Sequence, residues 1–207
     1  MASGYDRRPM LPRLPHSALL RATPRRHTRA AHRTSVDRLT RQWLTAPGSL
    51  TARLRLHGQV SVRVMRQGHQ SLWPQEQGAV RARTGHVREV VLTIDGRPAV
   101  WARSVTSAKG LKGPWRALKG LGTRPLAELL FEHRGVRRDP LWSDRFPDHS
   151  RQASHVRRQW RAFATRAHEP ERTPAWARRS VFWHKGQALQ VMECFSPWVL
   201  RLSPHHR

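Results

Sequence analysis

The chain is poor in cysteine and in acidic residues, and it has no long hydrophobic run. Its 207 residues include one cysteine, Cys194, so neither a disulfide framework nor a thiolate zinc cluster can form within it. No apolar stretch approaches the ~20 residues of a membrane span, and the first residues lack the apolar core of a signal peptide. We therefore expect a cytoplasmic protein with no membrane span.

Acidic residues number 13 against 39 lysines and arginines, which gives a formal net charge of +26. Clustered cations attract nucleic acid, because they release counterions from phosphates. The charge is uneven, however. Residues 1–34 read as a basic, disordered N-terminal arm of arginines and prolines, and a second basic block spans residues 133–172. Because ordinary apolar periodicity lies between and after these blocks, we expect no specific nucleic-acid partner, and a nucleic-acid-binding protein is the first alternative.

Motifs for cofactors and metals are also missing. The stretch GLKGPWRALKG has glycines, but no strand precedes it and no Gly-Lys-Ser/Thr ending follows. The histidines include no ligand-spaced pair on a firmly predicted helix. We expect neither a metal nor a cofactor.

The apolar residues predict antiparallel hairpins with helices before and between them. An Asp-Gly pair at 95–96 and a Lys-Gly pair at 185–186 each separate two runs rich in β-formers. Residues 67–80, rich in Gln and Gly, are predicted to be a loop. No strand–helix–strand rhythm persists, so the fold class is α+β, with a single antiparallel β-sheet flanked by helices.

One folded domain is expected over residues 35–200, followed by a short tail at 201–207. Within it, residues of about 143–175 read as a basic insertion between proline-containing linkers. Its centre is predicted to be an amphipathic helix, with an apolar face formed by Val156, Trp160 and Phe163.

The first hairpin, HVREVVLTIDGRPAVWARSV at 86–105, places two arginines among apolar side chains. With a two-residue loop, Pro98 falls opposite Thr93 and Arg88 falls opposite Arg103, so both arginines share one face. Opposed like charges cost stability, which predicts that water or an anion separates them.

Four stretches together resemble the chorismate–pyruvate lyase family, which makes 4-hydroxybenzoate for ubiquinone synthesis. They are GSLTARLRLHGQVSVRVMRQG, VREVVLTIDGRPAVWARSV, LKGLGTRPLAELLF and WARRSVFWHKGQALQVMECFSP, in order over roughly residues 36–198. The resemblance implies an antiparallel sheet flanked by helices, with the ligand buried under helical flaps. It also implies an enzyme that converts chorismate to 4-hydroxybenzoate and pyruvate without a cofactor. We expect this enzyme to be a monomer.

The resemblance also implies the site residues. Arg88 matches the family's ligand-binding arginine and Glu193 its glutamate, and both are candidates for catalysis. Leu50 and Leu126 match two further ligand contacts, although helical spacing alone makes them core residues. Arg103 aligns with an arginine of the return strand. We hypothesise that it holds the enolpyruvyl carboxylate while Arg88 holds the ring carboxylate, since each guanidinium can grip a carboxylate with two hydrogen bonds.

Purely structural roles are open for the charged pair. Arg88 can pair with Glu89 at a sheet edge. Counting back from the second hairpin turn places Glu193 opposite Arg178, where the two would form a cross-strand ion pair. A non-catalytic aromatic-acid sensor is the second alternative to an enzyme.

Overall fold

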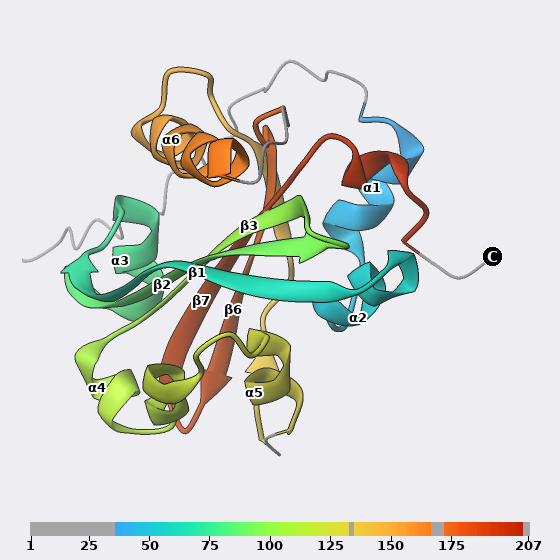
Figure 1. Ribbon diagram of the computed structural model, residues 1–207. Helices are drawn as coiled ribbons and strands as arrows, with labels where there is room; N and C mark the ends of the chain where they lie inside the picture. Colours follow the sequence, from blue (N-terminus) through green and yellow to red (C-terminus); the bar gives the residue numbers. More distant parts are fainter. Residues whose placement is uncertain (1–35, 133–134, 167–171, 205–207) are drawn as a thin grey trace, which may run out of the picture. The chain divides into compact units, whose positions relative to one another are not determined.

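The computed structural model describes residues 36–132, 135–166 and 172–204 (Figure 1), and the predicted arm at 1–34 lies outside them. The helices are α1 (Arg38–Thr45), α2 (Leu50–Leu54), α3 (Pro74–Val80), α4 (Ala108–Lys112), α5 (Leu126–Glu132) and α6 (Arg151–Arg166), with 3₁₀ turns η1 (Arg55–His57), η2 (Arg116–Gly120) and η3 (Val199–Arg201). The strands are β1 (Val60–Ser71), β2 (Thr84–Ile94), β3 (Arg97–Thr106), β4 (Arg137–Arg138), β5 (Trp142–Arg145), β6 (Trp176–His184) and β7 (Gln187–Phe195). None of the helices in these ranges is long and apolar enough to cross a membrane.

All these strands belong to one antiparallel sheet in the order β1-β2-β3-β7-β6-β4, and β5 also pairs with β6. The prediction of an α+β fold with a single antiparallel sheet is confirmed. The loop predicted at 67–80 is wrong, because β1 pairs with β2 as far as Ser71 and α3 follows. As an edge strand with exposed side chains, β1 tolerates polar residues, and Pro74 with the capping Glu76 starts α3.

The first hairpin contains a β-bulge that the sequence pattern did not predict. Pro98 lies opposite Thr93 as expected, but Leu92 pairs with Val100, so Ala99 is an extra residue on β3. The bulge is held from a distant part of the chain, because the Ser196 amide donates to the Ala99 carbonyl at 2.9 Å. One extra residue turns every later side chain of β3 to the other face of the sheet.

The bulge separates the two arginines that were predicted to face each other, and that prediction is wrong. Arg88 lies opposite Ser104, and Arg103 lies opposite Glu89. Arg103 therefore points to the opposite face of the sheet from Arg88. There its Nε donates to Glu76 at 2.7 Å, and its Nη1 donates to Glu89.

This face of β2 and β3, which carries Arg103, is covered by α6 and α3. Val156 and Trp160 of α6 are fully buried against Trp101 and Met192, and Phe163 packs beside them. The predicted amphipathic helix is confirmed. Figure 1 shows α6 on one side of the strands and α5 on the other.

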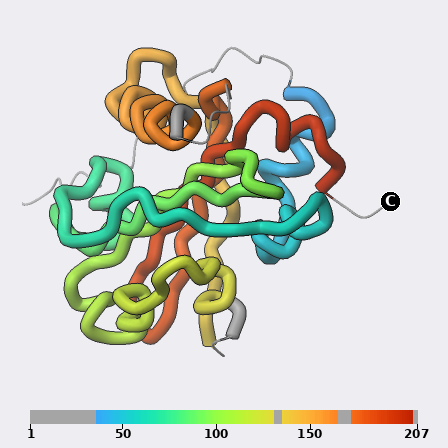
Figure 2. The backbone as a smooth tube through the Cα atoms, in the orientation of Figure 1, coloured from blue at the N-terminus to red at the C-terminus, as the bar shows by residue number. Residues whose placement is uncertain are grey.

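The opposite face of the sheet carries two separate apolar clusters. One lies under α1 and α2 and centres on Trp43 and Leu54, and the other lies under η2 and α5 and centres on Trp115 and Leu129. Helix α1 also lies beside the last described residues (Figure 2), where the Trp43 indole donates to the Leu202 carbonyl at 2.9 Å. The helices therefore cover the sheet in two groups, with a seam between them.

Candidate active site

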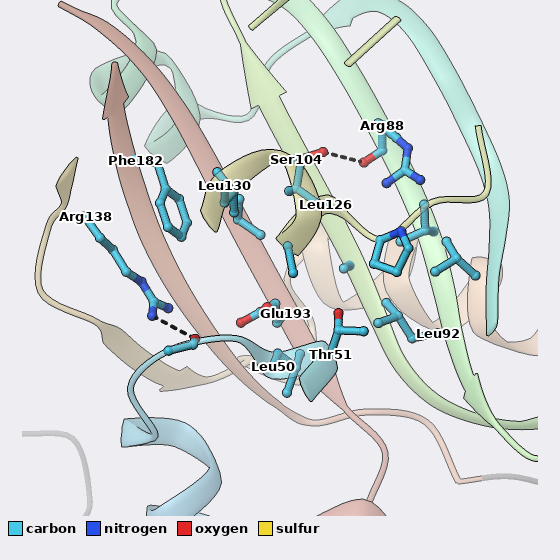
Figure 3. Close-up of a pocket in the computed structure, with 17 residues that line it drawn as sticks. Leu50, Thr51, Arg88, Leu92, Ser104, Leu126, Leu130, Arg138, Phe182 and Glu193 are labelled. Carbon is cyan, nitrogen blue, oxygen red and sulfur yellow. Dashed lines mark hydrogen bonds between the residues drawn. The ribbon is translucent and has the colours of Figure 1, made fainter. Parts of the chain in front are cut away.

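A cavity opens at the seam between the two clusters (Figure 3). Strands β2, β3 and β7 form its floor, and α2 and α5 lie over it, as the predicted helical flaps require. The space between these elements amounts to roughly 630 Å³ when its open mouth is included. Its walls are mostly apolar, and its charged lining residues are Arg88, Arg138 and Glu193.

Arg88 is a buried cation without a carboxylate partner among the described residues. Its side chain is 2 % exposed, and its Nη2 donates to the carbonyls of Gly122 at 2.8 Å and Arg124 at 3.2 Å. Its Nε has no acceptor within the described part of the chain. Burial lowers the pKa of Arg88 to about 10, so the group stays protonated at neutral pH. Glu89 lies on the other face of the sheet, so a pairing of Arg88 with Glu89 is excluded.

The loop before α5 supplies the acceptors that hold Arg88. Gly122 has a φ of +57°, a left-handed conformation that favours glycine, and the chain there turns its carbonyl toward the guanidinium. Leu126 begins α5 directly after this loop, and Leu50 begins α2 after its N-cap Ser49. Both leucines line the cavity. Backbone N–H groups in a first helical turn have no acceptor within the helix, so those of Leu50 and Leu126 can donate to a ligand.

Glu193 lies across the cavity from Arg88 (Figure 3). Arg178 faces it on β6, and the Arg178 Nε donates to the Glu193 Oε2 at 2.6 Å, so the ion pair counted from the hairpin is confirmed. The Arg178 Nη1 also donates to the carbonyls of Trp43 and Ala46, each at 3.0 Å, which fixes its position. The Glu193 side chain is 16 % exposed, and its Oε1 has no donor among the described residues. The ion pair thus orients the carboxylate and leaves one oxygen for a ligand.

The structure brings four of the five predicted site residues together and leaves Arg103 out. Arg88, Leu50, Leu126 and Glu193 line the cavity, whereas Arg103 is held by carboxylates on the far face. The one-residue bulge is the reason for this difference.

Arg138, which the sequence reasoning missed, lines the cavity from β4. In the sequence, Arg138 lies between the charged residues Arg137 and Asp139. No strand pattern marked its position, because β4 has only two residues. Only its pairing with β6 places it at the site.

The fold and the site give a mainly apolar pocket with a buried cation, Arg88, on one side and a carboxylate, Glu193, on the other. The chain belongs to the chorismate lyase family, whose sequence profile matches residues 24–201. It is 43 % identical over 166 residues to a probable chorismate pyruvate-lyase of Albidiferax ferrireducens, covering 76 % of this chain and 83 % of that protein. It is also 43 % identical over 174 residues to a probable chorismate pyruvate-lyase of Azoarcus sp., covering 81 % and 89 %.

A solved structure with a similar fold is PhnF from Mycobacterium smegmatis. The TM-score is 0.50 and the sequence identity 13 %, with 77 % of this chain and 69 % of that chain covered. At this identity the likeness concerns the fold alone.

Proposed function

We propose that this protein eliminates pyruvate from chorismate and releases 4-hydroxybenzoate, the first committed step toward ubiquinone. One observation carries the proposal beyond family membership: Arg88 and Glu193 lie on opposite sides of one apolar pocket. Chorismate carries a carboxylate at ring carbon C1 and a hydroxyl at C4, on opposite sides of an apolar ring. The two ends of the ligand therefore match the two ends of the pocket.

Arg88 binds the ring carboxylate in this arrangement. Its guanidinium stays charged although buried, and a carboxylate is the acceptor that its free Nε and the nearby helix start of Leu126 can share. At the other end, the Glu193 Oε1 accepts a hydrogen bond from the C4 hydroxyl, while Leu50 contacts the same end of the ring. The apolar walls exclude water from the ring.

The reaction is an elimination that leaves the overall oxidation state unchanged. The C4–H bond breaks and its electron pair forms the C3–C4 double bond, which completes the aromatic ring. The C3–O bond breaks, its electron pair leaves on the enolpyruvyl oxygen, and the enol takes a proton at its methylene carbon to become pyruvate. No electrons enter or leave, so the step needs no redox cofactor. Glu193 lies at the C4 end of the ring and is the group we assign to accept the C4 proton.

We place the enzyme in the cytoplasm as a monomer without a specific nucleic-acid partner. The nucleic-acid alternative used the aromatic side chains Trp160 and Phe163 for base stacking. Trp160 is fully buried against the sheet and Phe163 is partly buried beside it, which disfavours stacking on α6. An aromatic-acid sensor would bind 4-hydroxybenzoate in the same pocket without turnover.

One assay separates the enzyme from both alternatives. Purified protein is mixed with chorismate, and pyruvate and 4-hydroxybenzoate are measured over time. We expect both products in equal amounts, at many molecules per molecule of protein. Binding of 4-hydroxybenzoate without pyruvate release would identify a sensor and contradict the proposal.

A further inference from the structure

Chorismate carries a second carboxylate, on its enolpyruvyl group, and Arg103 lies on the wrong face of the sheet to bind it. Among the described residues that line the cavity, only one other cation is present, Arg138 of β4. It reaches the pocket from the side of β6, away from Arg88, as Figure 3 shows.

The contacts of Arg138 leave much of its hydrogen-bonding capacity unused. Its Nη2 donates to the Ser180 hydroxyl at 3.2 Å, and its Nη1 makes a long contact of 3.4 Å to the Gly48 carbonyl. Its Nε is buried and has no acceptor within the described ranges. No carboxylate of the described residues forms an ion pair with it. A guanidinium that is held only by neutral groups can still bind an anion, because it can donate two hydrogen bonds to one carboxylate.

The position of Arg138 is set relative to Glu193. The ring of Phe182 lies under the guanidinium, 5.2 Å from ring centre to Cζ, and keeps it at the level of the pocket. Figure 3 shows the Arg138 guanidinium on the same side of the pocket as Glu193. Burial lowers the pKa of Arg138, the charge of Glu193 acts to raise it, and the charge of Arg178 acts to lower it. Among the described residues that line the cavity, Arg138 is therefore the cation on the Glu193 side.

The chemistry of chorismate places its second carboxylate at that same end. The enolpyruvyl ether is attached at C3, next to the C4 hydroxyl that Glu193 contacts. With the ring carboxylate on Arg88, the enolpyruvyl group extends from the Glu193 end of the ring. We propose that Arg138 binds the enolpyruvyl carboxylate and stabilises the negative charge that the leaving enolpyruvate gains as the C3–O bond breaks. This inference rests on the lyase activity proposed above.

Two probes separate this role from a general effect on the pocket. The product 4-hydroxybenzoate lacks the second carboxylate, and 3-(carboxymethoxy)-4-hydroxybenzoate carries one on the ring carbon that bears the enolpyruvyl ether. Equilibrium binding of both is measured by calorimetry for the wild type and for Arg138→Gln. We expect the variant to bind the dicarboxylate about tenfold to a hundredfold more weakly, the loss of one charged hydrogen-bonding partner, and to bind 4-hydroxybenzoate within about threefold of the wild type. The KM of the variant for chorismate should rise by a similar factor to its dissociation constant for the dicarboxylate.

Arg137 provides a matched control on the same strand. It is the neighbouring residue, 71 % exposed, and pairs with Asp139 at 3.0 Å. Arg137→Ala should leave both dissociation constants unchanged. If Arg138→Gln does not fold, Arg138→Lys keeps the charge without the planar fork, and it should show the same selective loss at smaller size.

The outcomes distinguish the two proposals. Equal weakening of both ligands, or no weakening of the dicarboxylate, in an enzyme that still turns over chorismate would overturn the role of Arg138 alone. A wild type that releases no pyruvate from chorismate would overturn the lyase activity and this inference with it.

Discussion

At the scale of single residues, the two buried arginines of the first hairpin show how one chemistry serves opposite purposes. Arg103 is satisfied within the protein by Glu76 and Glu89, and the Trp73 ring lies 4.2 Å from its Cζ. Arg88 donates only to backbone carbonyls within the described chain. A buried charge without an opposite charge costs stability, and that cost is offset when an anion binds. We therefore assign Arg103 a role in stabilising the fold, and we propose that Arg88 binds the ligand.

This division predicts different stabilities for two matching substitutions. Arg103→Met leaves two buried carboxylates without their cation and should lower the free energy of unfolding by about 3–5 kcal/mol. Arg88→Met removes a buried charge that has no carboxylate partner among the described residues. This substitution should change the free energy of unfolding by no more than about 1 kcal/mol. Chemical denaturation without ligand measures both. The assignment of the two faces would be contradicted if Arg88→Met were the more destabilising change.

Glu193 is tested by removing its charge while keeping its shape. Glu193→Gln cannot accept a proton, so kcat should fall by about 10²–10⁴, the usual contribution of a general base. Binding of 4-hydroxybenzoate should weaken much less, because the amide oxygen still accepts from the hydroxyl or from Arg178. Stopped-flow release of pyruvate measures the rate. Turnover within a few-fold of the wild type would reject Glu193 as the base and leave it an orienting role.

At the scale of elements, the sequence predicted what local signals determine. The Asp-Gly and Lys-Gly turns and the amphipathic α6 follow from turn chemistry and periodicity. The bulge at Ala99 could not be predicted in this way, because contacts with Ser196 and Trp198 hold it. A single extra residue then moved Arg103 to the other face. Four of the five predicted site residues line the cavity, because they lie before the bulge or on other elements.

Helix α6 is attached to the sheet by a hydrogen bond as well as by apolar contact. The His155 Nε2 lies 3.0 Å from the Glu89 Oε1, beside the ion pair of Arg103. Burial acts to raise the pKa of Glu89, but the hydrogen bond with His155 and the charge of Arg103 lower it overall, so the carboxylate is ionised. The helix therefore covers the face of the sheet opposite the candidate site.

The role of α6 predicts a loss of stability without a loss of ligand binding. Trp160→Ala should lower the free energy of unfolding by about 3–5 kcal/mol, because the indole is fully buried in the cluster with Val156 and Met192. At a temperature where the variant is folded, its KM for chorismate should match the wild type. Denaturation and steady-state kinetics provide the two readings. A large rise in KM with unchanged stability would mean that α6 contributes to the active site instead.

At the scale of the whole molecule, the pocket follows from how two helical groups share one sheet. The cluster under α1 and α2 and the cluster under η2 and α5 do not merge, and the cavity lies where they separate. Residues from distant parts of the chain, such as Arg88, Arg138 and Glu193, meet only there. A ligand that fills the seam joins both groups and should stabilise the entire fold by mass action. The net charge of +26 also draws an anionic substrate toward the protein.

The most direct test is the dissociation constant of 4-hydroxybenzoate for the wild type and for Arg88→Met, measured by calorimetry at neutral pH. In the variant, the ring carboxylate is buried in an apolar site without its cation. We therefore expect binding to weaken by at least about a hundredfold. The same substitution should abolish the rise in melting temperature that the ligand gives the wild type. Unchanged affinity in a folded Arg88→Met protein would show that the aromatic acid binds elsewhere and would contradict the account.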